Sequence, residues 1–136
     1  MKVKISGDGA KMSRTTNFML LSFSLLQTGE KVMSSKGNRT LCIVNGPEKY
    51  DTLKSLMGNV ISEINSVIKN GKIDVDRKVS IEMCLGGDYK FLLMTMGLRG
   101  ATCDYACIWC EIHKLQRWDM TKDLDFYNTG DMKRTL

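Results

Sequence analysis

The sequence predicts an α/β fold of one domain, and three features of the chain predict it. Three apolar runs with strand-like alternation come first. A long stretch with helical periodicity follows them, and a fourth alternating run comes after that stretch. Three antiparallel strands, a crossover helix and a parallel strand together form an α/β layer arrangement.

The composition is that of one globular domain. The chain has 136 residues, of which 43% are hydrophobic and 26% are charged, and these values exclude global disorder. The 20 Lys and Arg against 15 Asp and Glu give a net charge of +5, which permits a nucleic-acid partner without requiring one.

The first three strands are expected in the first 45 residues. Lys2–Ser6 alternates polar and apolar residues and runs into Gly7-Asp8-Gly9. Asn17–Leu26 and Arg39–Val44 are the next two apolar runs, and Asn45-Gly46-Pro47 stops the third. Turn-forming residues separate the runs, so we expect consecutive antiparallel strands.

The period of the apolar residues then changes. Tyr50–Ile68 has the spacing of an amphipathic helix of about five turns, which Asn70-Gly71 ends. Val79–Cys84 alternates again as a fourth strand before Gly86-Gly87-Asp88, and Phe91–Leu98 is apolar all round, as in a buried helix or strand. This order of elements is also how the ribonuclease H-like fold begins, so we expect residues 1–98 to form a partial core of that kind.

Two shorter regions are expected after this core. Residues 99–118 contain a cysteine cluster, and residues 119–136 are polar with few apolar anchors, so we expect a loosely ordered tail. No apolar run has the length of a membrane span, and Gly7-Asp8-Gly9 comes too early for a signal peptide. We therefore expect a reduced nuclear or cytoplasmic protein that is not secreted and has no membrane partner.

Two aspartates are the candidate catalytic residues. Asp8 is expected just past the first strand and Asp88 just past the fourth, each beside glycines. If these strands are neighbours, both carboxylates emerge at one place and suit two Mg²⁺ or Mn²⁺ ions that serve phosphodiester chemistry. The alternative is that each aspartate caps its own backbone in a glycine turn.

The cysteine cluster is a candidate zinc site. Cys103, Cys107, Cys110 and His113 follow the spacing C-x3-C-x2-C-x2-H, and thiolates with an imidazole suit tetrahedral Zn²⁺. Cys107 and Cys110 form the sharper C-x2-C pair, whereas Cys103 and His113 are the less certain ligands. Buried reduced cysteines beside a surface histidine, or a redox pair, are the alternatives.

Several short motifs, in this order and spacing, resemble the V(D)J recombination-activating catalytic subunit and its Transib transposase relatives. The resemblance spans roughly residues 2 to 118. It includes the nineteen-residue step from Asp88 to Cys107. The matching motifs are Val3-Lys4-Ile5-Ser6-Gly7-Asp8-Gly9, Gly87-Asp88-Tyr89-Lys90, Gly97-Leu98-Arg99-Gly100-Ala101 and Tyr105-Ala106-Cys107-Ile108-Trp109-Cys110.

The resemblance implies a DDE-type DNA recombinase on a ribonuclease H-like core. Such an enzyme nicks DNA with water and then uses the new 3′-hydroxyl for strand transfer or hairpin formation. Asp8 and Asp88 match the first two metal-binding carboxylates, and Cys107 and Cys110 match half of a zinc site. The family's third acid, a glutamate, and its two zinc-binding histidines lie further downstream than Leu136, so we expect an incomplete site and leave open whether the chain is an enzyme.

A binding module is the other interpretation. In it, a zinc-stabilised domain binds DNA or a protein partner without chemistry. Under either interpretation the expected partners are DNA and a second copy of the chain or an accessory subunit. Basic residues of the first half could face phosphate, although solvated strand edges explain them more simply. These basic residues are Lys2, Lys4, Lys11, Arg14, Lys31, Lys36 and Arg39.

A degenerate gene fragment is a third possibility.

Overall fold

The computed structural model describes residues 1–34, 36–74, 76–128 and 132–134. It has a mixed α/β fold whose main sheet contains both antiparallel and parallel strands. The chain divides into two compact units, Met1–Asp88 and Tyr89–Leu136.

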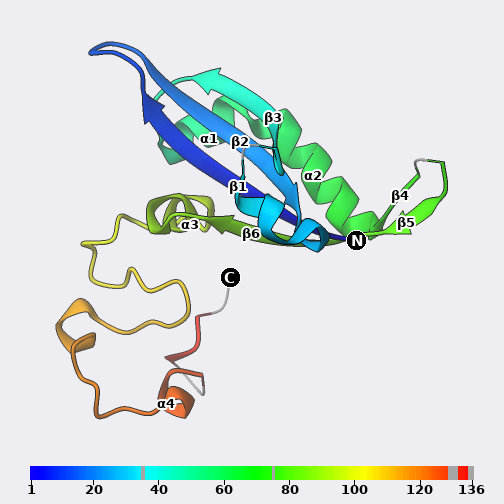
Figure 1. The fold of residues 1–136 in the computed structure, drawn as a ribbon. Helices are drawn as coiled ribbons and strands as arrows, with labels where there is room; N and C mark the ends of the chain where they lie inside the picture. Colours follow the sequence, from blue (N-terminus) through cyan, green and yellow to red (C-terminus); the bar gives the residue numbers. More distant parts are fainter. Residues whose placement is uncertain (35, 75, 129–131, 135–136) are drawn as a thin grey trace. The chain divides into compact units, whose positions relative to one another are not determined.

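The first unit is built on a four-stranded sheet in the order β3-β2-β1-β6 (Figure 1). β1 pairs with β2 and β2 with β3 in antiparallel fashion, whereas β6 runs parallel to β1 on its other side. The predicted arrangement of three antiparallel strands and a parallel fourth is therefore confirmed. The strands are β1 (Lys2–Lys11), β2 (Asn17–Leu25), β3 (Asn38–Asn45) and β6 (Glu82–Gly87).

Two helices lie along one face of this sheet (Figure 1): α1 (Tyr50–Leu56) and α2 (Gly58–Asn70). The prediction of one continuous helix was wrong, because the chain leaves helical geometry at Met57, with φ −110° and ψ 4°. Gly58 follows at once, and glycine is a poor helix former. α2 ends where expected, since Gly71 adopts the left-handed conformation with φ 63° and its amide donates to two carbonyls of the last turn.

The core of the first unit lies between this sheet face and the helices. Val3, Ile5, Met19 and Leu21 come from β1 and β2, where residues two apart share a face. None of the α2 residues is fully buried. Instead, the apolar side of α2 and the strands border a groove of about 270 Å³ that includes Val60, Ile64, Val67, Val3 and Phe23.

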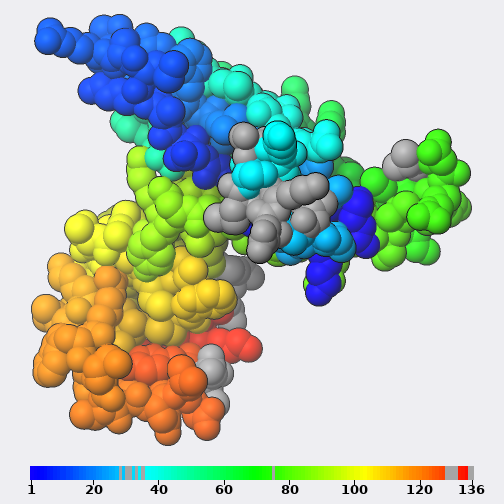
Figure 2. Space-filling model, in the orientation of Figure 1, coloured from blue at the N-terminus to red at the C-terminus, as the bar shows by residue number. Residues whose placement is uncertain are grey.

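A second, smaller sheet was not predicted. β4 (Lys72–Asp74) and β5 (Lys78–Ser80) form an antiparallel hairpin that projects from the first unit (Figure 2). The expected strand Val79–Cys84 is therefore two strands. Val79 pairs with Ile73 in the hairpin, and the chain joins the main sheet only from Glu82 onward. The 3-10 segment η1 (Leu26–Met33) connects β2 to the turn before β3.

The second unit contains little regular structure. Its elements are α3 (Tyr89–Thr95), the 3-10 turn η2 (Lys114–Gln116) and α4 (Leu124–Asn128). The apolar run expected over 91–98 is helical from its start, and Phe91, Leu93 and Met94 are buried. Within the expected tail, Lys133 forms an antiparallel bridge with Cys110, while residues 129–131 and 135–136 lie outside the described residues.

In the described part of the chain, no helix combines the length and the apolar character that crossing a bilayer requires.

We expect the junction between α1 and α2 to anchor the first unit. Met57 has no exposed surface, whereas its neighbour Leu56 is 55% exposed. Met57→Ala leaves a cavity and should lower the free energy of unfolding by about 2–5 kcal/mol, and Leu56→Ala by much less. Urea denaturation followed by circular dichroism measures both. Equal costs for the two substitutions would contradict the packing described here.

Candidate functional site

The register of the parallel strands places the two candidate aspartates together. The β1–β6 ladder ends with Gly7 opposite Gly87, so Asp8 and Asp88 are the residues that follow the last pair. Neighbouring strands lie about 4.8 Å apart, so the backbone of the chain is close at these two positions. The prediction that these strands are neighbours is confirmed.

The two side chains line one depression of about 380 Å³, here called the carboxylate pocket. Asp8 and Asp88 are both exposed, so solvent and ions reach them. The other lining residues come from β1, β2, β3 and β6 and are mainly small or polar. The lining residues are Ser6, Gly7, Asp8, Leu20, Ser22, Asn38, Gly87 and Asp88.

The sequence predicted Asp8 just past the end of the first strand, but in the structure Asp8 lies inside β1. β1 continues through Gly7 and Gly9 to Lys11, and Asp8 is paired opposite Leu20 of β2. The alternative of a glycine turn around Asp8 therefore does not apply. Asp88 does follow its strand directly, and Gly87 before it adopts φ 146°, a conformation that favours glycine.

The donor set fits a divalent cation only in part. Carboxylate oxygens are the ligands that Mg²⁺ and Mn²⁺ prefer. However, among the described residues no group of three or more His, Cys, Asp and Glu side chains is placed to hold a metal ion. The pocket thus offers two acids, and we expect weak affinity from so small a set.

Cys107 and Cys110 form a close pair in the second unit. Their sulfur atoms are 3.4 Å apart, and the Trp109 amide donates to the Cys107 sulfur at 3.4 Å. Two thiolates of a tetrahedral zinc site lie about 3.8 Å apart, given Zn–S bonds of about 2.3 Å. The separation in this pair is about 0.4 Å shorter than that distance. A pocket of about 450 Å³ borders it, with Tyr89, Ile112 and Tyr127 among its lining residues.

The two thiols differ in acidity. Burial acts to raise the pKa of Cys107, yet hydrogen bonds from the Trp109 and Cys110 amides outweigh it and leave this pKa below the usual thiol value. Burial raises the pKa of Cys110, and the neighbouring Cys107 sulfur adds to the increase. Cys107 is thus the thiol that loses its proton first.

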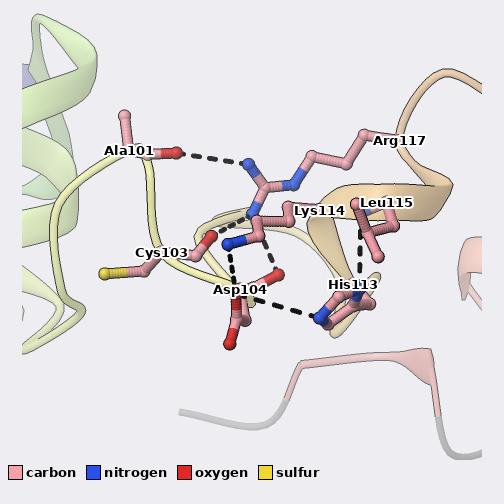
Figure 3. Close-up of polar contacts among 7 residues, drawn as sticks. All are labelled: Ala101, Cys103, Asp104, His113, Lys114, Leu115 and Arg117. Carbon is pink, nitrogen blue, oxygen red and sulfur yellow. Dashed lines mark hydrogen bonds and ion pairs between the residues drawn. The ribbon is translucent and has the colours of Figure 1, made fainter.

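The less certain zinc ligands have other surroundings. The Nε2 atom of His113 lies 3.8 Å from an Asp104 carboxylate oxygen, and its Nδ1 atom accepts from the Leu115 amide. Figure 3 shows the Cys103 thiol directed away from the His113 ring. Neither residue is placed with Cys107 and Cys110 in a group of three ligands within the part of the chain that the structure describes.

Two arginines hold the loops around the cysteine pair, and the sequence did not indicate them. Arg117 donates to the carbonyls of Ala101, Cys103 and Asp104 (Figure 3). Arg134, whose side chain is only 10% exposed, donates to the carbonyls of Tyr105, Cys107 and Cys110. Hydrogen bonds to a charged donor are worth about 1.5–3 kcal/mol, so both contribute to loop order.

The basic residues of the first half are spread over several elements. Lys2 pairs with Glu82 at 3.4 Å across the β1–β6 ladder. Lys11 and Arg14 lie at and beyond the end of β1, Lys36 precedes β3 and Arg39 is its second residue, and all four are exposed. The side chain of Lys31 lies outside the described part. Lys4 alone is half-buried among those described.

Comparison with protein-family models and with curated proteins finds no match for this chain. The interpretation of both sites therefore depends on their geometry and on the chemistry of their residues.

We predict that the Asp104 carboxylate stays ionised, and paired with Lys114, to a lower pH than an ordinary aspartate does. A 2.8 Å ion pair and hydrogen bond with Lys114, with smaller effects from His113 and Arg117, lower the pKa of Asp104. Because the pKa of Asp104 is lower in the folded state, its carboxylate stabilises the fold at pH values above the pKa of the unfolded state, which is about 3.9. This stabilisation is lost as the pH falls through the lower pKa of the folded state. In an NMR titration, Lys114→Met should raise the pKa of Asp104, whereas Lys122→Met should leave it unchanged. An Asp104 that titrates at the ordinary value in the wild type contradicts the prediction.

Proposed function

We propose that the first unit is the metal-binding part of a DDE-type DNA recombinase core, and that the carboxylate pocket holds Mg²⁺ or Mn²⁺ through Asp8 and Asp88. The observation that carries this proposal is the register of β1 and β6. Two strands far apart in sequence end their parallel ladder at Gly7 and Gly87, and each presents an aspartate at the next position.

The topology supports the same proposal. Three antiparallel strands followed by a crossover helix and a parallel strand beside the first is the order in which a ribonuclease H-like core begins. Two of the motifs that carry the resemblance to the V(D)J recombination-activating subunit and Transib transposases contribute Asp8 and Asp88 to the pocket. Fold order and motif position therefore point to one activity.

The residues that line the carboxylate pocket are of the kind that metal-dependent phosphodiester chemistry requires. When bound there, Mg²⁺ or Mn²⁺ supplies positive charge for the attacking and leaving oxygens of a phosphodiester. Asp8 and Asp88 would hold the cation in the pocket that they line. With two acids and no third in place among the described residues, metal affinity and turnover should be low.

A second candidate function is a DNA-binding module without catalysis. The observation that favours it is the same two-acid set, since a complete two-metal site generally needs more ligands than the described residues bring together. In this case the net charge of +5 would supply salt-dependent affinity for DNA. DNA binding that is unaffected by removing both acids would favour this function over the first.

We predict that Mn²⁺ binding depends on both aspartates. Asp8→Asn and Asp88→Asn should each weaken Mn²⁺ binding by at least about tenfold, measured by isothermal titration calorimetry. Asp76→Asn, which changes an exposed acid of the β4–β5 hairpin, is the matched control and should bind Mn²⁺ as the wild type does.

A plasmid-nicking assay completes this test. We expect little or no Mn²⁺-dependent nicking by the wild-type chain. Nicking that disappears in both aspartate variants would show a more capable catalyst than the two-acid set indicates. Equal Mn²⁺ binding by the wild type and both variants would overturn the proposed site.

We also propose that Cys107 and Cys110 bind Zn²⁺, and we predict that zinc uptake depends on them. Zinc content measured after equilibration with limiting Zn²⁺ should fall by more than half in Cys107→Ala and Cys110→Ala. Cys84→Ala, which removes an exposed thiol of β6, should change nothing. Cys103→Ala and His113→Ala then show whether either supplies a further ligand. A folded wild-type protein without zinc contradicts the proposal.

A further inference from the structure

The sheet face opposite the helices carries a strip of polar side chains beside the carboxylate pocket. Val3 and Ile5 of β1 border the apolar groove under α2, so Lys4, Ser6 and Asp8 belong to the other face. Ser22 and Ser24 of β2 lie on this second face, because they pair with Ser6 and Lys4 in the antiparallel register. The metal-binding acids thus lie at one end of a row of polar groups.

Two hydroxyl groups form the floor of this row. The Ser6 and Ser22 oxygens are 3.3 Å apart, and Ser22 also lies 3.4 Å from the Ser6 carbonyl, to which it donates. Ser22 is only 5% exposed and is held in place by these contacts. The Ser6 hydroxyl is half-buried at the pocket. Because the Ser22 proton goes to the Ser6 carbonyl, the Ser6 hydroxyl donates to Ser22 in this arrangement, and a hydrogen bond from Ser6 to a ligand would replace that contact.

An amide donor on the next strand completes the row. Ser24, which is 1% exposed, donates its hydroxyl to the Oδ1 atom of Asn38 at 3.0 Å. This bond fixes which end of the Asn38 amide faces Ser24, and it leaves the Nδ2 group as a donor. Asn38 is exposed and lines the carboxylate pocket, so this donor is available to a ligand there.

A cation lies near the other end of the row. The aliphatic part of Lys4 passes over Gly86, where a Cβ atom would come within 2.8 Å of the Lys4 Cδ atom. Gly86 pairs with Ser6, so the lysine side chain runs toward the pocket. Unlike Lys2, which is bound to Glu82, Lys4 has no ion pair within the described residues.

These groups form a surface that is complementary to the sugar–phosphate backbone of a nucleic acid. Carboxylates accept hydrogen bonds and repel anions, whereas the ammonium, hydroxyl and amide groups beside them donate to anionic oxygens. We propose that Lys4, Ser6 and Asn38 bind the sugar–phosphate backbone of DNA next to the Asp8/Asp88 metal site. This inference rests on the proposed function and names the residues that position its substrate.

The test separates DNA contact from metal binding. The probe is a fluorescein-labelled single-stranded oligonucleotide in the presence of Mn²⁺, with affinity measured by anisotropy across salt concentrations. Lys4→Gln and Asn38→Ala should each weaken DNA binding by about five- to tenfold and leave Mn²⁺ affinity unchanged. Lys4→Gln should also lower the slope of log affinity against log salt by about one.

Matched controls lie on the same strands. Lys2→Gln removes a lysine of β1 that is already paired with Glu82, and Asn45→Ala removes an exposed asparagine at the far end of β3. Each should change DNA affinity by less than about twofold. Gly86→Ala keeps the Lys4 charge but displaces its side chain, and we expect a loss smaller than that of Lys4→Gln.

Each outcome has a distinct meaning. Wild-type DNA affinity in both Lys4→Gln and Asn38→Ala, with circular dichroism showing intact folds, overturns the assignment of DNA contacts. Equal losses in Lys2→Gln and Lys4→Gln also overturn it, because they indicate diffuse charge attraction. Failure of the wild-type protein to bind Mn²⁺ overturns the proposed function instead, and it is measured separately.

Discussion

The parallel pairing of β1 with β6 is the constraint on which the candidate site depends. A parallel ladder has a fixed register, and here the register matches Gly7 with Gly87. A shift of one residue would turn Asp8 and Asp88 to opposite faces, since side chains alternate along a strand. Val3 and Ile5 of β1 and Met83 of β6 all border the apolar groove on the helix side, and a shift between the strands would turn Met83 away from it. Burial on one face of the sheet thus maintains the chemistry on the other.

The sequence predicted this sheet well because its signals are local. Alternation, turn residues and the change of period indicated three strands, a helix region and a parallel fourth strand. Prediction from the sequence failed where the structure depends on contacts between residues that are not neighbours in the chain. Met57 is fully buried at a break in the helix, and Val79 pairs with Ile73 in a hairpin that the apolar pattern concealed. The continuation of β1 through Asp8 depends on pairing with β2, which the glycines on either side had obscured.

The candidate sites were predictable to different degrees. Asp8, Asp88 and the Cys107–Cys110 pair have recognisable motifs. Ser22, Ser24 and Asn38 do not, because their importance comes from cross-strand contacts and each is an ordinary polar residue in the sequence. Arg117 and Arg134 are similar cases: they bind carbonyls between 13 and 29 residues away in the chain, and no spacing rule predicts such contacts. The second unit depends on these guanidinium groups because it has few long helices or strands to order its loops.

The conformation of Gly87 has a consequence for the residue that follows it. At φ 146°, a residue with a side chain would distort the exit from β6 at the position that precedes Asp88. A substitution at Gly87 is therefore expected to change how the chain presents residue 88, even when the aspartate itself is kept. The glycine controls the position of a neighbour whose chemistry it does not share.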